Sequence, residues 1–313
     1  MKRLVFDQNR LIALREGDAA IKSVIEDPDN LIYIQDANLA EAWKAGPQRL
    51  EELMVSLLPY RRRVRLVPTH TQIMDLELVM RRPVRRREIH GFNPSDIFEE
   101  TFDDVANGRK TIFENWHNAE NQRKSQEQYD NHPEVMTEYY RELSSAFEDA
   151  DQNMGKKGGS SLTKRMRVPE IIDESILDLC VGLSIQRVEQ VIKKANKPFS
   201  VVKKIGYAPS FHMVYFLTKY IRVIQKFAND SMGKMVEAGS KKLGNEYFDS
   251  LNVSLAPFFD EFLTKDKTTS ATAKHQNAAL SLFHQRKSAI VDRLDNARIL
   301  ARENSGSSRC PKH

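Results

Sequence analysis

The chain has 313 residues, of which 40% are hydrophobic and 29% are charged, and its formal net charge is +5. This length and composition can bury one large core or two modest ones, which excludes disorder of the whole chain. No window holds the roughly 18 uncharged apolar residues of a membrane span. The N-terminus turns acidic at Asp7, unlike a signal peptide. Cys180 and Cys310 form neither a disulfide framework nor a zinc pattern. We expect a soluble, cytoplasmic protein.

The first 91 residues alternate short apolar runs with helical patterns. Apolar runs typical of buried parallel strands lie at 3–6, 31–34 and 64–67. Apolar residues recur at helical intervals over 11–25, 37–43 and 48–58. Asp36 or Asn38 would cap the second of these helices. Because short strands and helices alternate, residues 1–91 predict the first part of an α/β domain with a short central parallel sheet.

Residues 92–204 are interpreted as a mainly helical insertion. Strand patterns stop at its start, residues 96–150 are polar and favour helices, and a helical pattern resumes over 169–194. Residues 151–164 are rich in glycine, lysine and serine, but they lack the Gly-x4-Gly-Lys-Ser/Thr spacing and a preceding strand. We therefore interpret them as a flexible loop and not as a phosphate-binding loop.

The second part of the α/β domain is expected over residues 205–290. Residues 211–227 predict an amphipathic helix with one side in the core. The residues on that side are Val214, Leu217, Ile221 and Ile224. Residues 291–313 predict the end of a helix followed by a disordered tail.

Positive charge is concentrated in one short segment. Between residues 61 and 87, nine arginines stand against only Asp75 and Glu77, so the local excess is larger than the net charge of the whole chain. The nine are Arg61, Arg62, Arg63, Arg65, Arg81, Arg82, Arg85, Arg86 and Arg87. Guanidinium groups fit phosphate oxygens, and clustered basic residues are typical of nucleic-acid-binding surfaces. We predict nucleic-acid binding here; the alternatives are a solvated surface or a docking site for an acidic partner.

Carboxylates follow several of the predicted strands. Asp7 ends the first strand, Glu41 lies one turn into the helix after the second, and Asp266 follows a later apolar run. Glu246 and Asp249 are three residues apart, so on a helix they share one face. The carboxyl ends of parallel strands meet at one edge of the sheet, where open α/β folds place their chemistry. Carboxylates gathered there would repel one another without a cation, and their oxygens favour Mg²⁺ or Mn²⁺.

These residues resemble the motifs of the PIN-domain family of metal-dependent ribonucleases. The matching pieces are Asp7-Gln8-Asn9 at the end of a strand, Glu41 after the second strand, Asp249 opening a helix, and Thr264-Lys265-Asp266 after a strand. The resemblance covers about residues 1–90 and 205–285 and leaves the helical insertion outside it. It implies a PIN-like three-layer α/β/α fold.

By this resemblance, Asp7, Glu41, Asp249 and Asp266 would bind one or two Mg²⁺ or Mn²⁺ ions, which would activate water for hydrolysis of a phosphodiester. Glu246 would be an additional ligand, and Asp36 is the rival of Glu41. Asn9 and Thr264 would orient the ligands or a substrate phosphate. Each acid also has a structural alternative, as a helix cap, a turn residue or a solvated surface residue.

The sequence thus predicts a metal-dependent endoribonuclease, with RNA favoured over DNA as its substrate. The alternative is a catalytically inactive PIN-like module that binds nucleic acid or assembles with protein. Its helical insertion would then supply the interface to a partner or to a second copy. Other hydrolase and cofactor motifs are absent, and the eight histidines show no ligand spacing. His70, His90 and His212 are expected at the surface or satisfied in the core, and Trp43 and Trp116 in the core or an interface.

Overall fold

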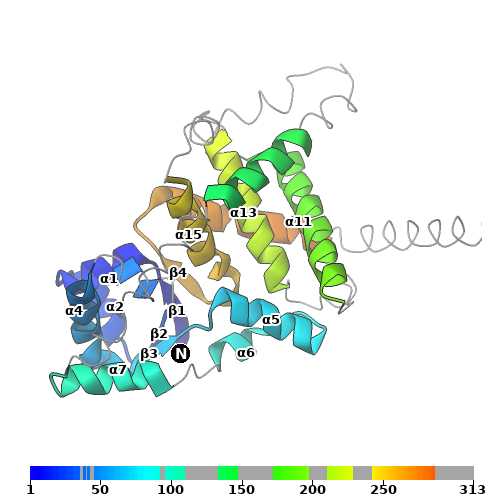
Figure 1. The fold of residues 1–313 in the computed structure, drawn as a ribbon. Helices are drawn as coiled ribbons and strands as arrows, with labels where there is room; N and C mark the ends of the chain where they lie inside the picture. The colour runs from blue at the N-terminus through cyan, green and yellow to red at the C-terminus, as the bar shows by residue number, and fades with distance from the viewer. Residues whose placement is uncertain are drawn as a thin grey trace, which may run out of the picture.

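Four parallel strands form the sheet in this computed structural model (Figure 1). They are β1 (Lys2–Phe6), β2 (Asn30–Ile34), β3 (Val64–Leu66) and β4 (Glu261–Leu263), in the spatial order β3-β2-β1-β4. Although β4 is remote in sequence, it pairs with β1 and places Leu263 beside Phe6. The predicted α/β class with a parallel sheet is confirmed.

The structure describes most of the chain but not all of it. The described residues are 1–35, 38–39, 41–42, 46–91, 96–109, 133–146, 172–196, 210–227 and 242–285. Asp36, Trp43, Trp116, Cys310, the loop 151–164 and the tail 291–313 lie outside them.

Helices cover both faces of the sheet, because alternate residues of a strand point to opposite sides. Leu4, Phe6 and Ile32 pack against one set of helices, and Val5 and Tyr33 pack against another. The first set is α1 (Gln8–Arg15), α2 (Ala19–Glu26) and α4 (Pro47–Leu57). The second set is α5 (His70–Met80), α6 (Arg86–His90) and α13 (Phe211–Phe227), and α11 (Glu174–Lys194) packs against α13 in the same core. Three layers result.

The other described helices extend these two layers. They are α7 (Asp96–Ala106), α15 (Lys242–Ser254), the 3-10 helices η1 (Leu58–Arg63) and η2 (Ala256–Phe258), and residues 133–146 and 267–285. Buried residues of 133–146 and α11 belong to the same hydrophobic core as α5 and α13. Within the described ranges, no helix combines the length and the apolar character needed to span a membrane.

The helical pattern over residues 11–25 is broken into two helices, which corrects the prediction of one. Gly17, after the end of α1, has a φ of +85°, a left-handed conformation that favours glycine. The carboxylate of Asp18 then accepts the backbone N–H groups of Ala20 and Ile21 and so begins α2. The apolar spacing continues across this turn, which is why the pattern alone predicted a single helix.

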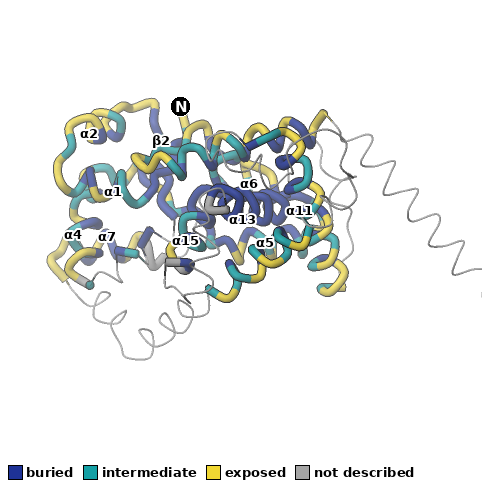
Figure 2. The backbone as a smooth tube through the Cα atoms, turned by 90° about the horizontal axis from the view of Figure 1, so that it is seen from above, coloured by how far each residue is buried: buried dark blue, intermediate teal, exposed yellow. Residues whose placement is uncertain are grey.

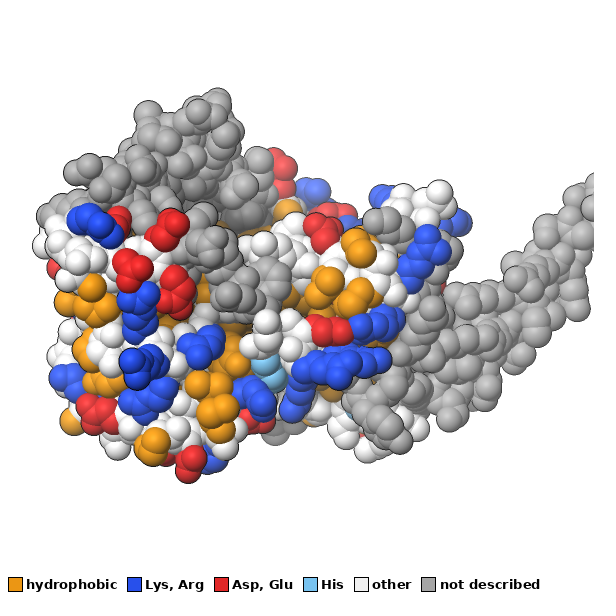
Figure 3. All heavy atoms as spheres, turned by 90° about the horizontal axis from the view of Figure 1, so that it is seen from below, with side chains coloured by type: hydrophobic (Ala, Val, Ile, Leu, Met, Phe, Trp, Pro, Cys, Tyr) orange, Lys and Arg blue, Asp and Glu red, His pale blue; other side chains and the backbone are white. Residues whose placement is uncertain are grey.

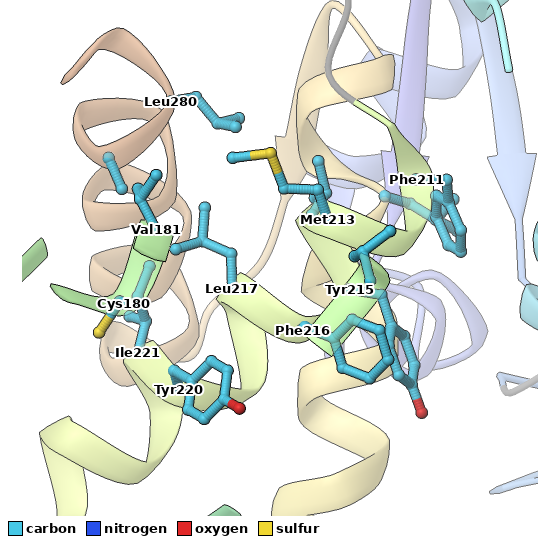
Figure 4. Close-up of a cluster of buried hydrophobic side chains, with 14 of the residues drawn as sticks. Cys180, Val181, Phe211, Met213, Tyr215, Phe216, Leu217, Tyr220, Ile221 and Leu280 are labelled. Atoms are coloured by element: carbon cyan, nitrogen blue, oxygen red, sulfur yellow. The ribbon is translucent and has the colours of Figure 1, made fainter. Parts of the chain in front are cut away.

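Helix α13 has the bounds and the amphipathic pattern that were predicted, but it is buried on its polar side as well. Every residue from 210 to 225 is buried, including Lys219 and Arg222 (Figure 2). Its apolar side lies in the core as expected, with Leu217 close to Val181 of α11 (Figure 4). Its polar side contacts α15 and the helical residues 267–285 through hydrogen bonds. Segments that are remote in sequence therefore bury the polar side of α13, which the pattern alone would leave in contact with solvent.

A buried carboxylate fixes the start of α13. Glu77, on α5, is 0% exposed. It accepts hydrogen bonds from the backbone N–H groups of Phe211, His212 and Val84 and from the hydroxyl of Ser210. The ring nitrogen Nδ1 of His212 lies 2.6 Å from the same carboxylate. An anion at a helix N-terminus is stabilised by the unpaired N–H groups there, so Glu77 anchors α13 to α5.

His70, His90 and His212, predicted at the surface or satisfied in the core, are all hydrogen-bonded; His70 and His212 are buried and His90 is half-buried. The Nε2 atom of His70 lies 2.8 Å from the carbonyl oxygen of Leu251. The Nε2 atom of His90 lies 2.7 Å from the carbonyl oxygen of Phe258. With the contact between His212 and the carboxylate on α5, all three imidazoles join segments that are remote in sequence.

Candidate functional site

Asp7 and Thr264 meet at the carboxyl edge of the sheet, where β1 and β4 end side by side. The N–H of Asp7 donates to the carbonyl oxygen of Leu263, which extends the pairing of the two strands. The hydroxyl of Thr264 and the side-chain amide of Asn9 each donate to Oδ2 of Asp7 at 2.7 Å. The N–H of Lys265 in turn donates to Oδ1 of Asn9 at 2.8 Å. The structure thus brings Asn9 and Thr264 onto the Asp7 carboxylate and fixes its orientation.

Asp7 and Asp266 also cap helices. Oδ1 of Asp7 accepts the N–H of Gln8 at 2.8 Å, at the start of α1. Oδ1 of Asp266 accepts the N–H of Thr269 at 2.5 Å, at the start of the helical residues 267–285. The structural alternative in which Asp7 is a helix cap is therefore correct. In the same alternative Asp266 was predicted as a turn residue, and the structure shows that it caps a helix instead. Capping uses one oxygen of each carboxylate and leaves its charge in place.

Helix α15 is held over this edge by two contacts. The side-chain amide of Gln35, which directly follows β2, donates to the carbonyl oxygen of Asn252 at 3.1 Å. His70, at the start of α5, contacts the carbonyl oxygen of Leu251. Asp249 lies inside α15 and does not open it, which corrects the prediction, because the helix already begins at Lys242. Sequence analysis had no role for Gln35.

The acids of the site act on one another electrostatically. Burial raises the pKa of Asp249 to about 6, and the negative charges of Glu246, Asp7 and Asp266 add to this rise, while Arg222 opposes it. The rise occurs although 41% of the Asp249 side chain is exposed. Burial also raises the pKa of Asp7, with a contribution from the charge of Asp266. Four carboxylates from three remote segments therefore share one region of negative potential.

Arg222 is the central residue that sequence analysis missed. It lies on α13, its side chain is 2% exposed, and its Nη2 donates to Oε2 of Glu246 at 2.7 Å and to Oδ2 of Asp249 at 2.8 Å. Glu246 and Asp249 share one face of α15, as their spacing predicted. The guanidinium neutralises part of their charge. In the sequence, Arg222 fell on the expected polar side of α13, where a solvated arginine is unremarkable.

Glu41 lies half-buried in the helical residues that follow β2, so it belongs to the same edge of the sheet. Its rival Asp36 is outside the described residues. Across the part of the chain that is described, no three His, Cys, Asp or Glu side chains are arranged to hold a metal ion. The acids nevertheless fit a divalent cation in donor type and charge, because carboxylate oxygens are hard ligands and the guanidinium of Arg222 contacts two of the four carboxylates.

The arginine segment lies at the opposite edge of the sheet. Helix η1, which contains Arg61 to Arg63, directly precedes β3, and Nη1 of Arg63 donates to the carbonyl oxygens of Glu26 and Asp27 ahead of β2. Nη2 of Arg86 donates to the carbonyl oxygen of Pro257, shortly before β4. All these contacts are at the amino edge. A five-residue strand spans about 16 Å, so Arg63 and Arg86, whose contacts are at the amino edge, lie about one strand length from the acidic site, whereas Arg65 lies inside β3 beside Tyr33.

The arginines on this face differ in their partners. Arg61 forms ion pairs with Glu99 and Asp103, and Arg82 pairs with Glu88. Arg62, Arg65, Arg81, Arg85, Arg86 and Arg87 are exposed. Figure 3 views this side of the molecule, from below Figure 1, and shows Lys and Arg side chains gathered around a histidine. The exposed arginines other than Arg65 thus form a basic surface that is remote from the acids.

Comparisons of this chain with protein-family models, with curated proteins and with solved structures found no match. The interpretation of function therefore rests on the geometry of the carboxyl edge and on the basic surface.

Proposed function

We propose that this chain is a PIN-like, metal-dependent endonuclease that hydrolyses phosphodiester bonds, with RNA preferred over DNA. The observation that supports the proposal is the meeting of Asp7, Asp249 and Asp266 in one region of negative potential at the carboxyl edge. Asp7, Asp249, Asp266 and Glu41 would hold Mg²⁺ or Mn²⁺. Such an ion, when bound, lowers the pKa of water and supplies hydroxide at neutral pH.

The chain's own residues prepare this site before any ion is bound. Asn9 and Thr264 hold the carboxylate of Asp7 with two hydrogen bonds, so little side-chain freedom is lost when an ion binds. Asp249 keeps 41% of its side chain exposed, which gives a substrate access to the same carboxylates. A rigid inner ligand beside an accessible one is suited to an ion that must also contact a phosphate.

The test is cleavage of labelled single-stranded RNA with Mg²⁺ or Mn²⁺. The wild type is expected to cleave, and the double variant Asp7→Asn with Asp249→Asn is expected to be inactive. Asp29→Asn with Asp75→Asn is the matched control, because both of these carboxylates are exposed and lie on other segments. Cleavage that needs no metal, or that survives loss of Asp7 and Asp249, would refute the mechanism.

The exposed arginines at the amino edge are proposed to bind the nucleic-acid backbone away from the acids. Arg62→Ala with Arg85→Ala and Arg87→Ala should weaken RNA binding measured by fluorescence anisotropy. Each lost phosphate contact should reduce the slope of log K against log salt by about 0.7 for a single strand. The control combines Arg141→Ala, Lys193→Ala and Lys194→Ala, three exposed cations on other helices. An unchanged slope would assign this surface to an acidic protein partner.

The ion pairs of Arg222 favour a second candidate function, a catalytically inactive module. A guanidinium that neutralises Glu246 and Asp249 stabilises these acids without a metal ion. In that case the protein would bind RNA through the basic surface and cleave neither RNA nor DNA with any divalent ion. Retained binding in the anisotropy assay together with absent cleavage would select this candidate.

A further inference from the structure

We propose that the guanidinium of Arg222 takes the place of one divalent ion, so that the carboxyl-edge site binds a single ion with Asp7, Asp249 and Asp266 among its ligands. This inference rests on the proposed metal-dependent function and deepens it by fixing the number of ions. It also removes Glu246 from the metal ligands and assigns its carboxylate to Arg222.

A single nitrogen atom of Arg222 joins both carboxylates of α15. Its Nη2 lies 2.7 Å from Oε2 of Glu246 and 2.8 Å from Oδ2 of Asp249. Both distances are those of charge-assisted hydrogen bonds, so one cationic group already compensates an oxygen of each carboxylate. The position between Glu246 and Asp249 is therefore already filled by a positive charge.

Arg222 is a permanent occupant of that position. Its side chain is 2% exposed, its Nη1 lies 3.4 Å from the hydroxyl of Thr272, and α13 is buried on every side. The Nε atom is buried and has no hydrogen-bond partner among the described residues, so the ion pairs to α15 are its principal compensation. A guanidinium stays protonated at any ordinary pH, and leaving its partners would create an uncompensated buried charge.

Arg222 leaves part of the negative charge of the acidic site in place. Arg222 uses Oδ2 of Asp249, and Asp249 has a second carboxylate oxygen on a side chain that is 41% exposed. Asp7 and Asp266, which follow β1 and β4, act on Asp249 through their negative charges. A second divalent ion would have to lie against the guanidinium and would be repelled by it.

The experiment counts ions on the 313-residue chain by equilibrium dialysis against Mn²⁺ and measures affinity by titration calorimetry. The wild type should bind one Mn²⁺ per chain, and Arg222→Gln, which frees both carboxylates of α15, should bind two. Glu246→Gln should still bind one, with an affinity within about threefold of wild type, whereas loss of a true ligand lowers affinity at least about tenfold. Arg187→Gln is the matched control, because Arg187 bridges Glu138 and Glu142 on other helices.

The outcomes separate this inference from the proposed function. Two ions on the wild type, one ion on folded Arg222→Gln, or a tenfold loss of affinity in Glu246→Gln would each overturn the role of Arg222 and leave the nuclease intact. A wild type that binds no Mn²⁺ would overturn the metal-dependent function itself. If Arg222→Gln does not fold, Glu246→Gln decides, because glutamine keeps an acceptor oxygen for Arg222 and removes only the charge.

Discussion

Replacing Glu77 by glutamine tests whether this buried carboxylate anchors α13. The change keeps the size of the side chain but turns one acceptor oxygen into an NH₂ donor. Oε1 accepts the N–H groups of Val84 at 2.9 Å and Phe211 at 2.6 Å. Oε2 contacts the hydroxyl of Ser210, the N–H of His212 and the Nδ1 of His212, at 2.8, 3.0 and 2.6 Å. Glutamine therefore leaves two or three buried donors facing another donor.

The expected loss of stability follows from these lost acceptors. A buried polar group without a partner costs about 1–3 kcal/mol, and breaking a buried charged pair costs about 3–5 kcal/mol. We expect Glu77→Gln to lower the free energy of unfolding by about 3–5 kcal/mol. At about 2–4 °C per kcal/mol for a chain of this size class, the melting temperature should fall by roughly 10 °C.

The assay is urea unfolding followed by circular dichroism, with differential scanning calorimetry for the melting temperature. Glu100→Gln is the matched control, because Glu100 is exposed on α7, and its melting temperature should change little. Glu77→Asp keeps the charge on a shorter side chain and should lie between wild type and Glu77→Gln. Equal melting temperatures for Glu77→Gln and Glu100→Gln would refute the anchoring role.

Three further predictions concern the carboxyl edge and α13. The folded protein holds the proton of Asp249 more tightly than the unfolded chain, because burial raises its pKa from 3.8 to about 6. Without added metal, the free energy of unfolding should therefore fall as pH rises from about 4 to 6. The fall should be on the order of 1 kcal/mol, because the side chain is partly exposed. Asp249→Asn should flatten this part of the pH curve measured by urea unfolding. Lys219 is fully buried, its Nζ has no hydrogen-bond partner among the described residues, and burial holds its pKa well below the usual range. The rings of Tyr247, Tyr215 and Tyr139, at 3.6, 4.5 and 5.9 Å from Nζ, would stabilise a charge there. Lys219→Met should raise the free energy of unfolding at pH 7 by about 1 kcal/mol or more, and a loss of stability would show that the cation–π contacts outweigh desolvation. Thr264→Val removes a hydrogen-bond donor to Asp7 and should weaken Mn²⁺ binding about tenfold in calorimetry. Thr137→Val on a remote helix is the control and should leave the affinity unchanged. Equal affinities for the two variants would contradict the role of Thr264 in orienting Asp7.

Local patterns in the sequence determined the sheet and the residues that follow its strands. The apolar runs at 3–6, 31–34 and 64–67 are strands within one or two residues of their predicted ends, because a buried strand needs only a short continuous apolar segment. Asp7 and Asp266 were correctly placed just past strand ends. The position of Arg61 to Arg63 at the amino edge could also be predicted from the sequence, because these residues precede a strand of a parallel sheet.

Only the tertiary structure decided what neutralises the acids and what covers α13. Arg222 meets Glu246 and Asp249 because α15 lies across α13, and nothing within either segment predicts that contact. The polar side of α13 matches a solvated surface in its spacing, yet α15 and residues 267–285 bury it. Periodicity reports which residues share a face, and the partner of that face is set by long-range packing. The positions of the acids after the strands follow from local sequence patterns, whereas the position of Arg222 beside them follows from the tertiary fold.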